Sequence, residues 1–396
     1  MPFSTLTPQP NDPLLALIKS YAADPREEKI DLGVGVFRDE RGATPIMAAV
    51  KQAEEQLLTT QDSKSYLGPE GDKGFVTAIA EHLFGEIQTH RAIDGLQTPG
   101  GTGALRLAGE LLVRSGVKRI IVASPTWANH LAIFQEVGLS VITTPCFDLK
   151  TQSFDLKGFS ETLNAAEAGD AVLLHGCCQN PLGIDPTKQD WRVIADIIAS
   201  RQLLPLIDIA YQGLGDGWEK DNLGARTILS AVPYGLLAYS CDKNFGLYRE
   251  RTGALYVSAP DAESLHCTLS NLLHLARTNW SMPPDHGAAV VRLILTNAAL
   301  HTVWREELET MRQRILSLRH ELAHLGTIGS LNLAPIAHGK GMFATLPLTP
   351  SQVTWLREHY AIYMAHTGRI NIAGFGEGDI QRFGSALHAL MKQNIA

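Results

Sequence analysis

The chain has 396 residues, of which 45% are hydrophobic and 19% charged, and this length favours two or three domains around a large core. Its formal net charge of −7 comes from 34 basic and 41 acidic side chains, with no basic block. Nucleic acids and anionic membrane surfaces are therefore poor candidates as partners. No apolar run reaches the roughly 18 residues that a membrane span needs, and we expect no signal peptide at the N-terminus.

The cysteines are few and odd in number, and they occur in apolar stretches of sequence. They are Cys146, Cys177, Cys178, Cys241 and Cys267. We expect reduced thiols in a cytoplasmic protein. The run from His175 to Cys178 suggests a metal site, but two adjacent cysteines do not easily take tetrahedral positions around one ion. We therefore expect no metal.

Short apolar runs alternate with segments of helical periodicity between residues 100 and 258. Six runs are rich in Val, Ile and Leu without polar alternation, as strands covered on both faces of a sheet are. These predicted strands are residues 119–124, 141–144, 171–175, 203–208, 235–240 and 253–257. The pattern predicts an α/β domain built on a mostly parallel sheet.

A long amphipathic helix is predicted next, because apolar residues recur at alternating spacings of three and four over residues 300–325. We expect this helix, at about residues 297–325, to bridge two domains. Beyond it, residues 339–345 and 363–366 are predicted strands of a smaller α+β unit. The predicted division is an N-terminal arm with part of the small domain (1–45), a large domain (46–310) and a small C-terminal domain (311–396).

Reactive side chains gather where the predicted strands end, which is where open α/β sheets bind their ligands. Lys243 falls just past the strand at residues 235–240. An amine placed there is poorly solvated and available to attack carbonyls. Asp208 closes another strand, and a glycine-rich turn in residues 98–106 opens a helix. Together these groups match the requirements of pyridoxal phosphate.

Each part of this cofactor has a candidate partner. Lys243 supplies the Schiff-base amine, and Asp208 supplies a buried carboxylate that keeps the pyridine nitrogen protonated. The flat ring needs an aromatic face, and the phosphate needs amides at a helix N-terminus with added hydroxyl and cationic donors. The candidates are Asn180 and Tyr211 for the phenolic oxygen, Trp127 for the ring, and Gly100, Gly101, Thr102, Ser240 and Arg251 for the phosphate.

Each candidate also has an ordinary structural explanation: Lys243 as a surface lysine, Asp208 as a helix cap, Trp127 as core. The glycine-rich turn lacks the Walker phosphate-binding pattern. It also follows no clear strand, which weakens a dinucleotide-binding interpretation. The agreement of six segments on one cofactor favours pyridoxal phosphate over coincidence.

Nearly end to end, the chain resembles the class I aminotransferases, specifically the aspartate/aromatic amino-acid aminotransferase branch. The resemblance rests on residues 10–17, 31–36, 65–71, 98–106, 208–211, 243–248 and 368–374. It implies a fold type I pyridoxal-phosphate enzyme, with a large domain on a mostly parallel seven-stranded sheet and a smaller α+β domain. It also implies a homodimer with active sites at the subunit boundary.

The resemblance assigns further roles. Arg369 would bind the substrate α-carboxylate through its planar guanidinium fork, and Arg277 would reach across the dimer to a distal carboxylate. Tyr66 would contact the phosphate bound by the neighbouring subunit. The resemblance also places His130 behind Asp208, Phe343 and Gly35 beside the substrate, Tyr211 among the catalytic residues, and Trp127 and Asn180 in contact with substrate.

Four positions depart from the family pattern. They are Asp242 for serine, Leu182 for threonine, Gln179 for histidine, and Met282 for asparagine or serine. A carboxylate at position 242 should repel the phosphate unless it pairs with Arg251 or points away. These departures leave the reaction class intact and bear on the substrate range.

We therefore predict an aminotransferase that works in two half-reactions, in which the Lys243 amine acts as general base and acid. The expected second substrate is 2-oxoglutarate. Arg277 suits dicarboxylates, and Met282 favours an aromatic or other apolar side chain. Val36, Arg38 and Thr44 resemble the aspartate-preferring side of the branch, so we expect activity on both aspartate and aromatic amino acids.

Two alternatives remain. One is a pyridoxal-phosphate lyase or decarboxylase of the same fold, which the pair of carboxylate-binding arginines disfavours. The other is a non-enzymatic regulatory module, which the intact lysine and the lack of a DNA-binding appendage disfavour.

Overall fold

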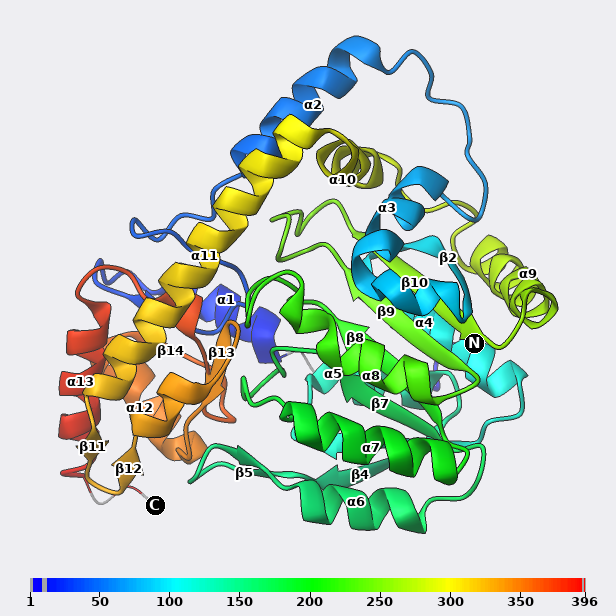
Figure 1. The fold of residues 1–396 in the computed structure, drawn as a ribbon. Helices are drawn as coiled ribbons and strands as arrows, with labels where there is room; N and C mark the ends of the chain where they lie inside the picture. Colours follow the sequence, from blue (N-terminus) through cyan, green and yellow to red (C-terminus); the bar gives the residue numbers. More distant parts are fainter. Residues whose placement is uncertain (1–2, 9–12, 394, 396) are drawn as a thin grey trace.

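The computed structural model describes residues 3–8, 13–393 and 395 (Figure 1). Its centre is a seven-stranded sheet in the order β2-β10-β9-β8-β7-β3-β4. Its strands are β2 (Ala92–Pro99), β3 (Arg119–Ser124), β4 (Ser140–Pro145), β7 (Ala171–His175), β8 (Leu204–Ile209), β9 (Gly235–Ser240) and β10 (Thr252–Ala259). Only β10 runs antiparallel to its neighbours in this sheet. The predicted mostly parallel seven-stranded sheet is confirmed.

Helices cover both faces of this sheet. One face packs against α3 (Lys73–Phe84), α6 (Leu156–Ala165), α7 (Lys188–Ser200) and α8 (Leu223–Ala231). The other packs against α4 (Gly100–Arg114), α5 (Ala128–Glu136) and α9 (Ala262–Asn279). Successive strand residues therefore point into two different cores, Ile120 into one and Ile121 into the other. This double burial explains why the strands are continuously apolar.

The sequence analysis missed β2. This strand lies at the edge of the sheet, pairs only with β10 and is half-exposed over its first residues, so its sequence shows no apolar run. It leads directly into α4 at Gly100. The statement that the glycine-rich turn follows no strand was therefore wrong, and it does not count against dinucleotide binding.

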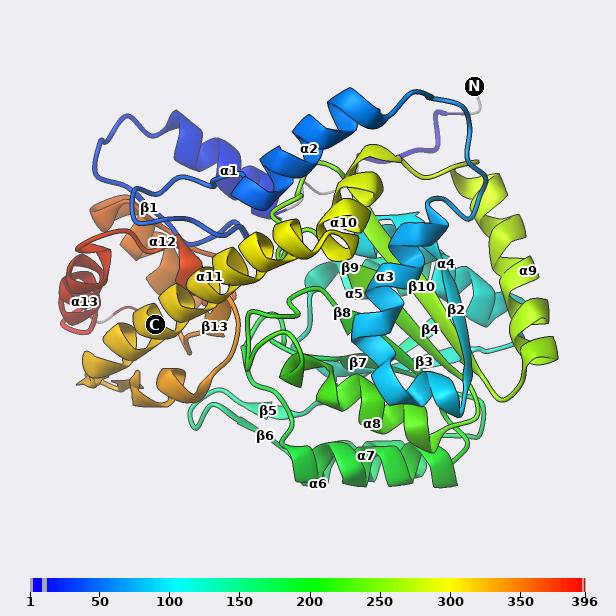
Figure 2. The ribbon, with the colours of Figure 1, turned by 45° about the horizontal axis from the view of Figure 1, so that its top comes forward.

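The predicted long helix is α11 (Ala298–His324), which the side chain of Asn297 caps by accepting the backbone N–H groups of Ala299 and Leu300. In Figures 1 and 2 it runs from α2 (Ala48–Thr60) and α10 (His286–Thr296) to the smaller unit. The apolar residues predicted at spacings of three and four over residues 300–325 form its buried stripe. The exception is Leu325, which lies just past the helix and is only partly buried.

One charged residue joins the buried stripe of α11, and the periodicity did not predict it. Arg319 is 1% exposed. Its guanidinium donates hydrogen bonds to the carbonyl oxygens of Ile336, Lys340, Gly341 and Phe343. These bonds offset the cost of burying the charge and tie α11 to the segment that carries Phe343.

The smaller unit gathers both ends of the chain around α11. Its helices are α1 (Pro13–Ala23), α12 (Pro350–Tyr360) and α13 (Asp379–Leu390). Its strand pairs are β1 (Ile30–Asp31) with β14 (Ile362–Tyr363), β11 (Thr327–Ile328) with β12 (Leu331–Asn332), and β13 (Phe343–Thr345) with β15 (Arg369–Asn371). The two predicted strands here are shorter than expected. The domain boundaries at residues 45 and 310 stay predictions.

Three smaller points complete the fold. A hairpin, β5 (Phe147–Asp148) with β6 (Ser153–Phe154), follows β4. Four cysteines are buried, but Cys267 is exposed on α9, contrary to the expected apolar surroundings. Residues 10–12 of the first family-like segment lie outside the described residues.

Within the described part of the chain, no single helix is long and apolar enough to cross a membrane. Only α10 and α11 taken together meet that test by length and composition, and they are bent by 100° at their junction.

Candidate active site

A cavity of about 280 Å³ lies at the carboxyl ends of β7, β8 and β9, between the sheet and the smaller unit. Twelve residues predicted for the site line it: Gly35, Gly101, Thr102, Trp127, Asn180, Asp208, Tyr211, Ser240, Lys243, Arg251, Phe343 and Arg369. Because these residues are spread from position 35 to position 369, the fold itself brings them together. Their convergence makes this cavity the candidate active site.

Asp208 is held by a chain of hydrogen-bonded side chains. His130 Nε2 lies 3.0 Å from Asp208 Oδ2, and Thr126 Oγ1 lies 2.8 Å from His130 Nδ1 and 3.0 Å from His175 Nε2. Burial by itself raises the pKa of Asp208. The hydrogen bond from His130 and nearby positive charge lower the pKa by more than burial raises it, so the pKa falls below its ordinary value. The carboxylate is therefore ionised and ready to bind a protonated nitrogen.

Thr126 and His175 also belong to this chain of side chains, although the sequence analysis did not assign either to the cofactor site. His175 ends β7 directly beside Asp208 in the sheet register, which is the signal that would have found it. Burial lowers its pKa to about 3, so it stays neutral. A neutral His175 can donate from Nε2 to the Thr126 hydroxyl, and that hydroxyl can donate to His130 Nδ1. The proton of His130 is then on Nε2, which donates to Asp208.

Lys243 projects into the same cavity. Its Nζ lies 3.5 Å from Asp242 Oδ2 and 5.4 Å from the centre of the Tyr211 ring. The Asn180 amide donates to the Tyr211 hydroxyl at 3.4 Å. Burial raises the pKa of Tyr211, so this hydroxyl keeps its proton and can act as a donor. An amine, a phenol and an amide therefore converge beside the Asp208 carboxylate.

The N-terminus of α4 forms one end of the cavity. Its N-cap, Pro99, makes no side-chain capping bond, so the first backbone N–H groups of the helix remain available. A Cβ atom on Gly100 would lie 2.4 Å from Arg251 Nη2, and one on Gly101 would lie 3.0 Å from the Ser240 Cβ. Backbone amides, a hydroxyl and a guanidinium thus enclose a spot suited to a phosphate.

Arg369 is the cationic group at the other side of the cavity. Its Nη2 donates to the Gly33 carbonyl at 2.7 Å, and its guanidinium lies 4.6 Å from the centre of the Phe343 ring. Its Nε is buried and has no partner among the described residues. Burial lowers the pKa of Arg369 without removing its charge at neutral pH. A partly buried cation with a buried, unused donor atom fits a carboxylate supplied from outside.

Gly35 lies against Phe343, the aromatic residue whose ring contacts Arg369. A Cβ atom at position 35 would approach the Phe343 Cζ to 2.8 Å, so a larger residue would displace the ring from the cavity wall. Gly35 therefore leaves room for the Phe343 ring at the cavity wall.

Two predicted residues lie away from the cavity that their own chain forms. Tyr66 is 92% exposed. Arg277 is also exposed, and its guanidinium donates to the Ser281 hydroxyl. Gly100 and His130 do not line the cavity either, but they lie directly behind Arg251 and Asp208.

Three of the four departures from the family pattern have defined contacts. The Gln179 side chain donates to the Pro125 carbonyl at 2.7 Å and accepts from the Leu182 backbone N–H at 2.9 Å, so it joins two loops of the cavity. Asp242 pairs with Arg251, which is one of the two arrangements considered from sequence. Met282 Sδ accepts from the Leu67 backbone N–H.

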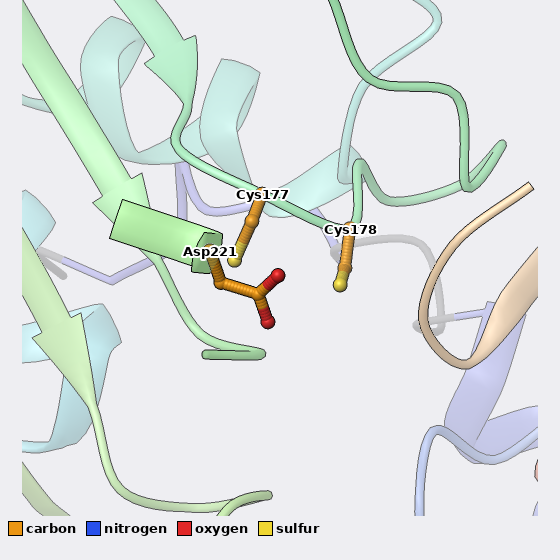
Figure 3. Close-up of side chains that lie close together, drawn as sticks. All are labelled: Cys177, Cys178 and Asp221. Atoms are coloured by element: carbon orange, nitrogen blue, oxygen red, sulfur yellow. The ribbon is translucent and has the colours of Figure 1, made fainter. Parts of the chain in front are cut away.

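Cys177, Cys178 and Asp221 form a separate buried cluster, with ligand atoms within 4.8 Å of one another (Figure 3). The Asp221 carboxylate already accepts three backbone N–H groups, from Gly213, Gly215 and Asp216. Burial raises its pKa to about 6. The Asp221 carboxylate therefore holds the turn at residues 213–216 through these hydrogen bonds, and we assign no metal to the cluster.

Comparison with known proteins identifies the family of the chain. The family model for aminotransferases of class I and II matches residues 27–387. A tyrosine aminotransferase of Rhizobium meliloti (strain 1021) is 49% identical over 372 residues, which cover 94% of this chain and 96% of the relative. An aspartate aminotransferase of Salmonella typhi is 41% identical and covers 98% of this chain and 100% of its own.

A solved structure extends the similarity to the fold. The aromatic-amino-acid aminotransferase from Burkholderia pseudomallei, covalently bound to pyridoxal phosphate, superposes with a TM-score of 0.94 at 33% identity, covering 98% of this chain and 99% of that one.

The fold and the cavity define an enzyme of the pyridoxal-phosphate type. The chain belongs to the aminotransferases of class I and II. The predicted aminotransferase fold and activity are confirmed, and the alternative of a lyase or decarboxylase is not favoured because these relatives are aminotransferases.

Proposed function

We propose that this enzyme transaminates aspartate and aromatic amino acids, with 2-oxoglutarate as the acceptor. The observation that carries the proposal is the single cavity in which Lys243, the Asp208 chain and Arg369 converge. The names of the relatives, which include tyrosine and aspartate aminotransferases, support both kinds of amino donor.

The residues present fit pyridoxal phosphate. The N-terminus of α4, Ser240 and Arg251 would hold the phosphate, and the Asp208 carboxylate would hold the ring nitrogen. Asn180 and Tyr211 would donate to the phenolic oxygen, and Trp127 would cover a ring face. When bound, this cofactor supplies an electron sink for the charge that develops at the substrate Cα.

Lys243 performs the proton transfers. Its amine is held near Tyr211 and Asp242 in the cavity, so it is positioned to move a proton from the substrate Cα to the cofactor in one half-reaction and in the opposite direction in the other. Asp208 stays ionised because His130 donates to it, and it therefore keeps a proton on the ring nitrogen throughout.

Arg369 binds the α-carboxylate, which every amino-acid substrate carries. Its buried, unused Nε favours a charge-assisted bond to that carboxylate. The contact with Phe343 fixes the plane of the guanidinium, so the carboxylate is bound in one orientation.

We propose a homodimer in which Arg277 and Tyr66 complete the active site of the neighbouring subunit. Both side chains are exposed and neither lines the cavity of its own chain. In this arrangement Arg277 would pair with the distal carboxylate of aspartate. The apolar thioether of Met282, which follows closely after Arg277 in the chain, would favour aromatic donors.

We also propose a cytoplasmic location. The support is that all five cysteines are free thiols, which suits a reducing compartment.

A paired assay tests the proposed function. Purified enzyme is incubated with 2-oxoglutarate and either aspartate or phenylalanine, and glutamate and the matching oxo acid are measured together. Equimolar appearance of both products with each donor supports the proposal, and the Lys243→Ala variant is the blank. Release of ammonia or carbon dioxide without glutamate would support the lyase or decarboxylase alternative instead.

A further inference from the structure

Asp242 places a carboxylate at the phosphate end of the cavity. The residue is 8% exposed, lines the cavity and directly precedes Lys243. Both of its carboxylate oxygens lie 3.0 Å from Arg251 Nη1, and one lies 3.5 Å from Lys243 Nζ. Its backbone N–H donates to the Ser240 hydroxyl at 3.3 Å. The carboxylate is therefore held between the two cations of this end of the site.

Arg251 is the guanidinium that the phosphate would use. Within the described residues, its hydrogen bonds all leave from Nη1, to Asp242 and to the Tyr248 carbonyl. Its Nη2 faces the start of α4, where a Cβ atom on Gly100 would lie 2.4 Å away. Asp242 and an anion at the N-terminus of α4 would thus share one guanidinium from two sides.

A phosphate dianion that shares the Arg251 guanidinium with the Asp242 carboxylate is bound less favourably than one that has the guanidinium to itself. Asp242 compensates the charge of Arg251 before any phosphate arrives, and its own negative charge lies on a side chain that is 11% exposed, where repulsion is less screened than in water. Lys243 offers no replacement, because its amine is committed to the cofactor aldehyde. The remaining attraction comes from the helix N-terminus and the Ser240 hydroxyl.

We propose that Asp242 competes with the cofactor phosphate for Arg251 and so weakens the retention of pyridoxal phosphate. The inference rests on the proposed function and on the phosphate site assigned there. The ion pair stabilises the empty site, and a bound phosphate has to share Arg251 with a like charge. The enzyme consequently exchanges its cofactor with solution more readily than a variant without this carboxylate.

The test compares cofactor affinity in Asp242→Ser and Asp242→Asn with wild type. Apoenzyme is titrated with pyridoxal phosphate and, separately, with pyridoxal, which lacks the phosphate, and bound ligand is followed by its visible absorbance. Inorganic phosphate alone is tested by the shift in melting temperature of each apoenzyme. The control is Glu250→Gln, which removes a carboxylate from the same segment at a side chain that lies against Gly287 of α10 instead of the cavity.

Both Asp242 variants should bind pyridoxal phosphate about 10- to 100-fold more tightly than wild type and gain a larger stabilisation from inorganic phosphate. Their affinity for pyridoxal should change by no more than about threefold, since no phosphate is present to be repelled. Glu250→Gln should match wild type.

Unchanged or weaker binding of pyridoxal phosphate in both Asp242 variants would overturn the inference, and weaker binding would show that Asp242 orders Arg251 for the phosphate. An equal gain for pyridoxal would also overturn it, because the effect would not involve the phosphate. Failure of wild type to bind pyridoxal phosphate would contradict the proposed function itself, which separates the two failures.

Discussion

His130 donates from Nε2 to Asp208 Oδ2 across 3.0 Å; the His130 side chain is fully buried and that of Asp208 is 11% exposed. Without this bond, burial would favour the protonated form of Asp208. With it, the carboxylate keeps its charge inside the protein. The hydrogen bond from His130 therefore stabilises the ionised form of Asp208, which places a fixed negative charge in the cavity wall.

Asp208→Asn tests this charge directly. The amide cannot hold a proton on the cofactor's ring nitrogen, so kcat should fall by about three orders of magnitude, or roughly 4 kcal/mol in the barrier. Asp208→Glu keeps the charge and should retain more activity. Steady-state kinetics on both variants measure the effect, and equal turnover by wild type and Asp208→Asn would make Asp208 a structural residue only.

His175 should make the folded enzyme less stable below neutral pH. Its pKa is lowered to about 3 by burial, compared with about 6.5 in an unfolded chain. Between these values the unfolded state binds a proton that the folded state does not, so the free energy of unfolding falls as the pH decreases. From about pH 7 to about pH 5 the loss should be at most about 2 kcal/mol.

Urea unfolding of the holoenzyme at these two pH values measures that loss, with His175→Gln as the comparison. The variant lacks the titrating group, so its stability should fall less on acidification. A loss of equal size in both proteins would assign the pH dependence to other groups, such as His82 and His301, whose pKa values burial also lowers.

Lys243→Ala should abolish transamination while leaving the fold intact. The other groups that line the cavity are unchanged, so the variant should still bind the cofactor. Mass spectrometry after borohydride reduction should find the cofactor attached to Lys243 in wild type and unattached in the variant. Normal turnover by Lys243→Ala would contradict the assignment of this lysine as the catalytic amine.

The candidate catalytic residues could be proposed from sequence because each lies at or just past the end of a buried strand. Asp208 and Lys243 lie at or just past the ends of β8 and β9, and such apolar runs are visible without a structure. Thr126 and His175 were missed because their importance lies in contacts between separate segments, which no local pattern encodes. Arg319 was missed for the opposite reason, since a charged residue on a buried helix face contradicts the pattern used to find the core.

The strand β2 shows a second limit of sequence analysis. An edge strand is covered on fewer sides than its neighbours, so it needs no continuous apolar run, and the half-exposed residues from Ala92 to Gly95 do not form one. The roles of Tyr66 and Arg277 rest on family resemblance alone, because a site shared between two chains leaves no trace in the periodicity of one.

Arg277 and Arg369 should differ in which substrates depend on them. Arg277→Ala should lower kcat/KM for aspartate by about two to three orders of magnitude, because a charge-assisted pair with the distal carboxylate is lost. Phenylalanine has no such carboxylate, so its half-reaction in a single turnover should lose much less. Arg369→Ala should impair both donors, since both carry an α-carboxylate. Equal losses for aspartate and phenylalanine in Arg277→Ala would show that Arg277 does not select dicarboxylates.

Subunit mixing tests whether Arg277 acts across a dimer. Lys243→Ala and Arg277→Ala subunits are each deficient in aspartate turnover, but a mixed dimer contains one site with Lys243 from one chain and Arg277 from the other. After the two are unfolded and refolded together, about half of the dimers should be mixed with one intact site in two, so aspartate activity should recover to about a quarter of wild type. Each variant refolded alone is the control. If Arg277 served its own subunit, no mixed dimer would contain an intact site, and the mixture would show no gain over the separate variants.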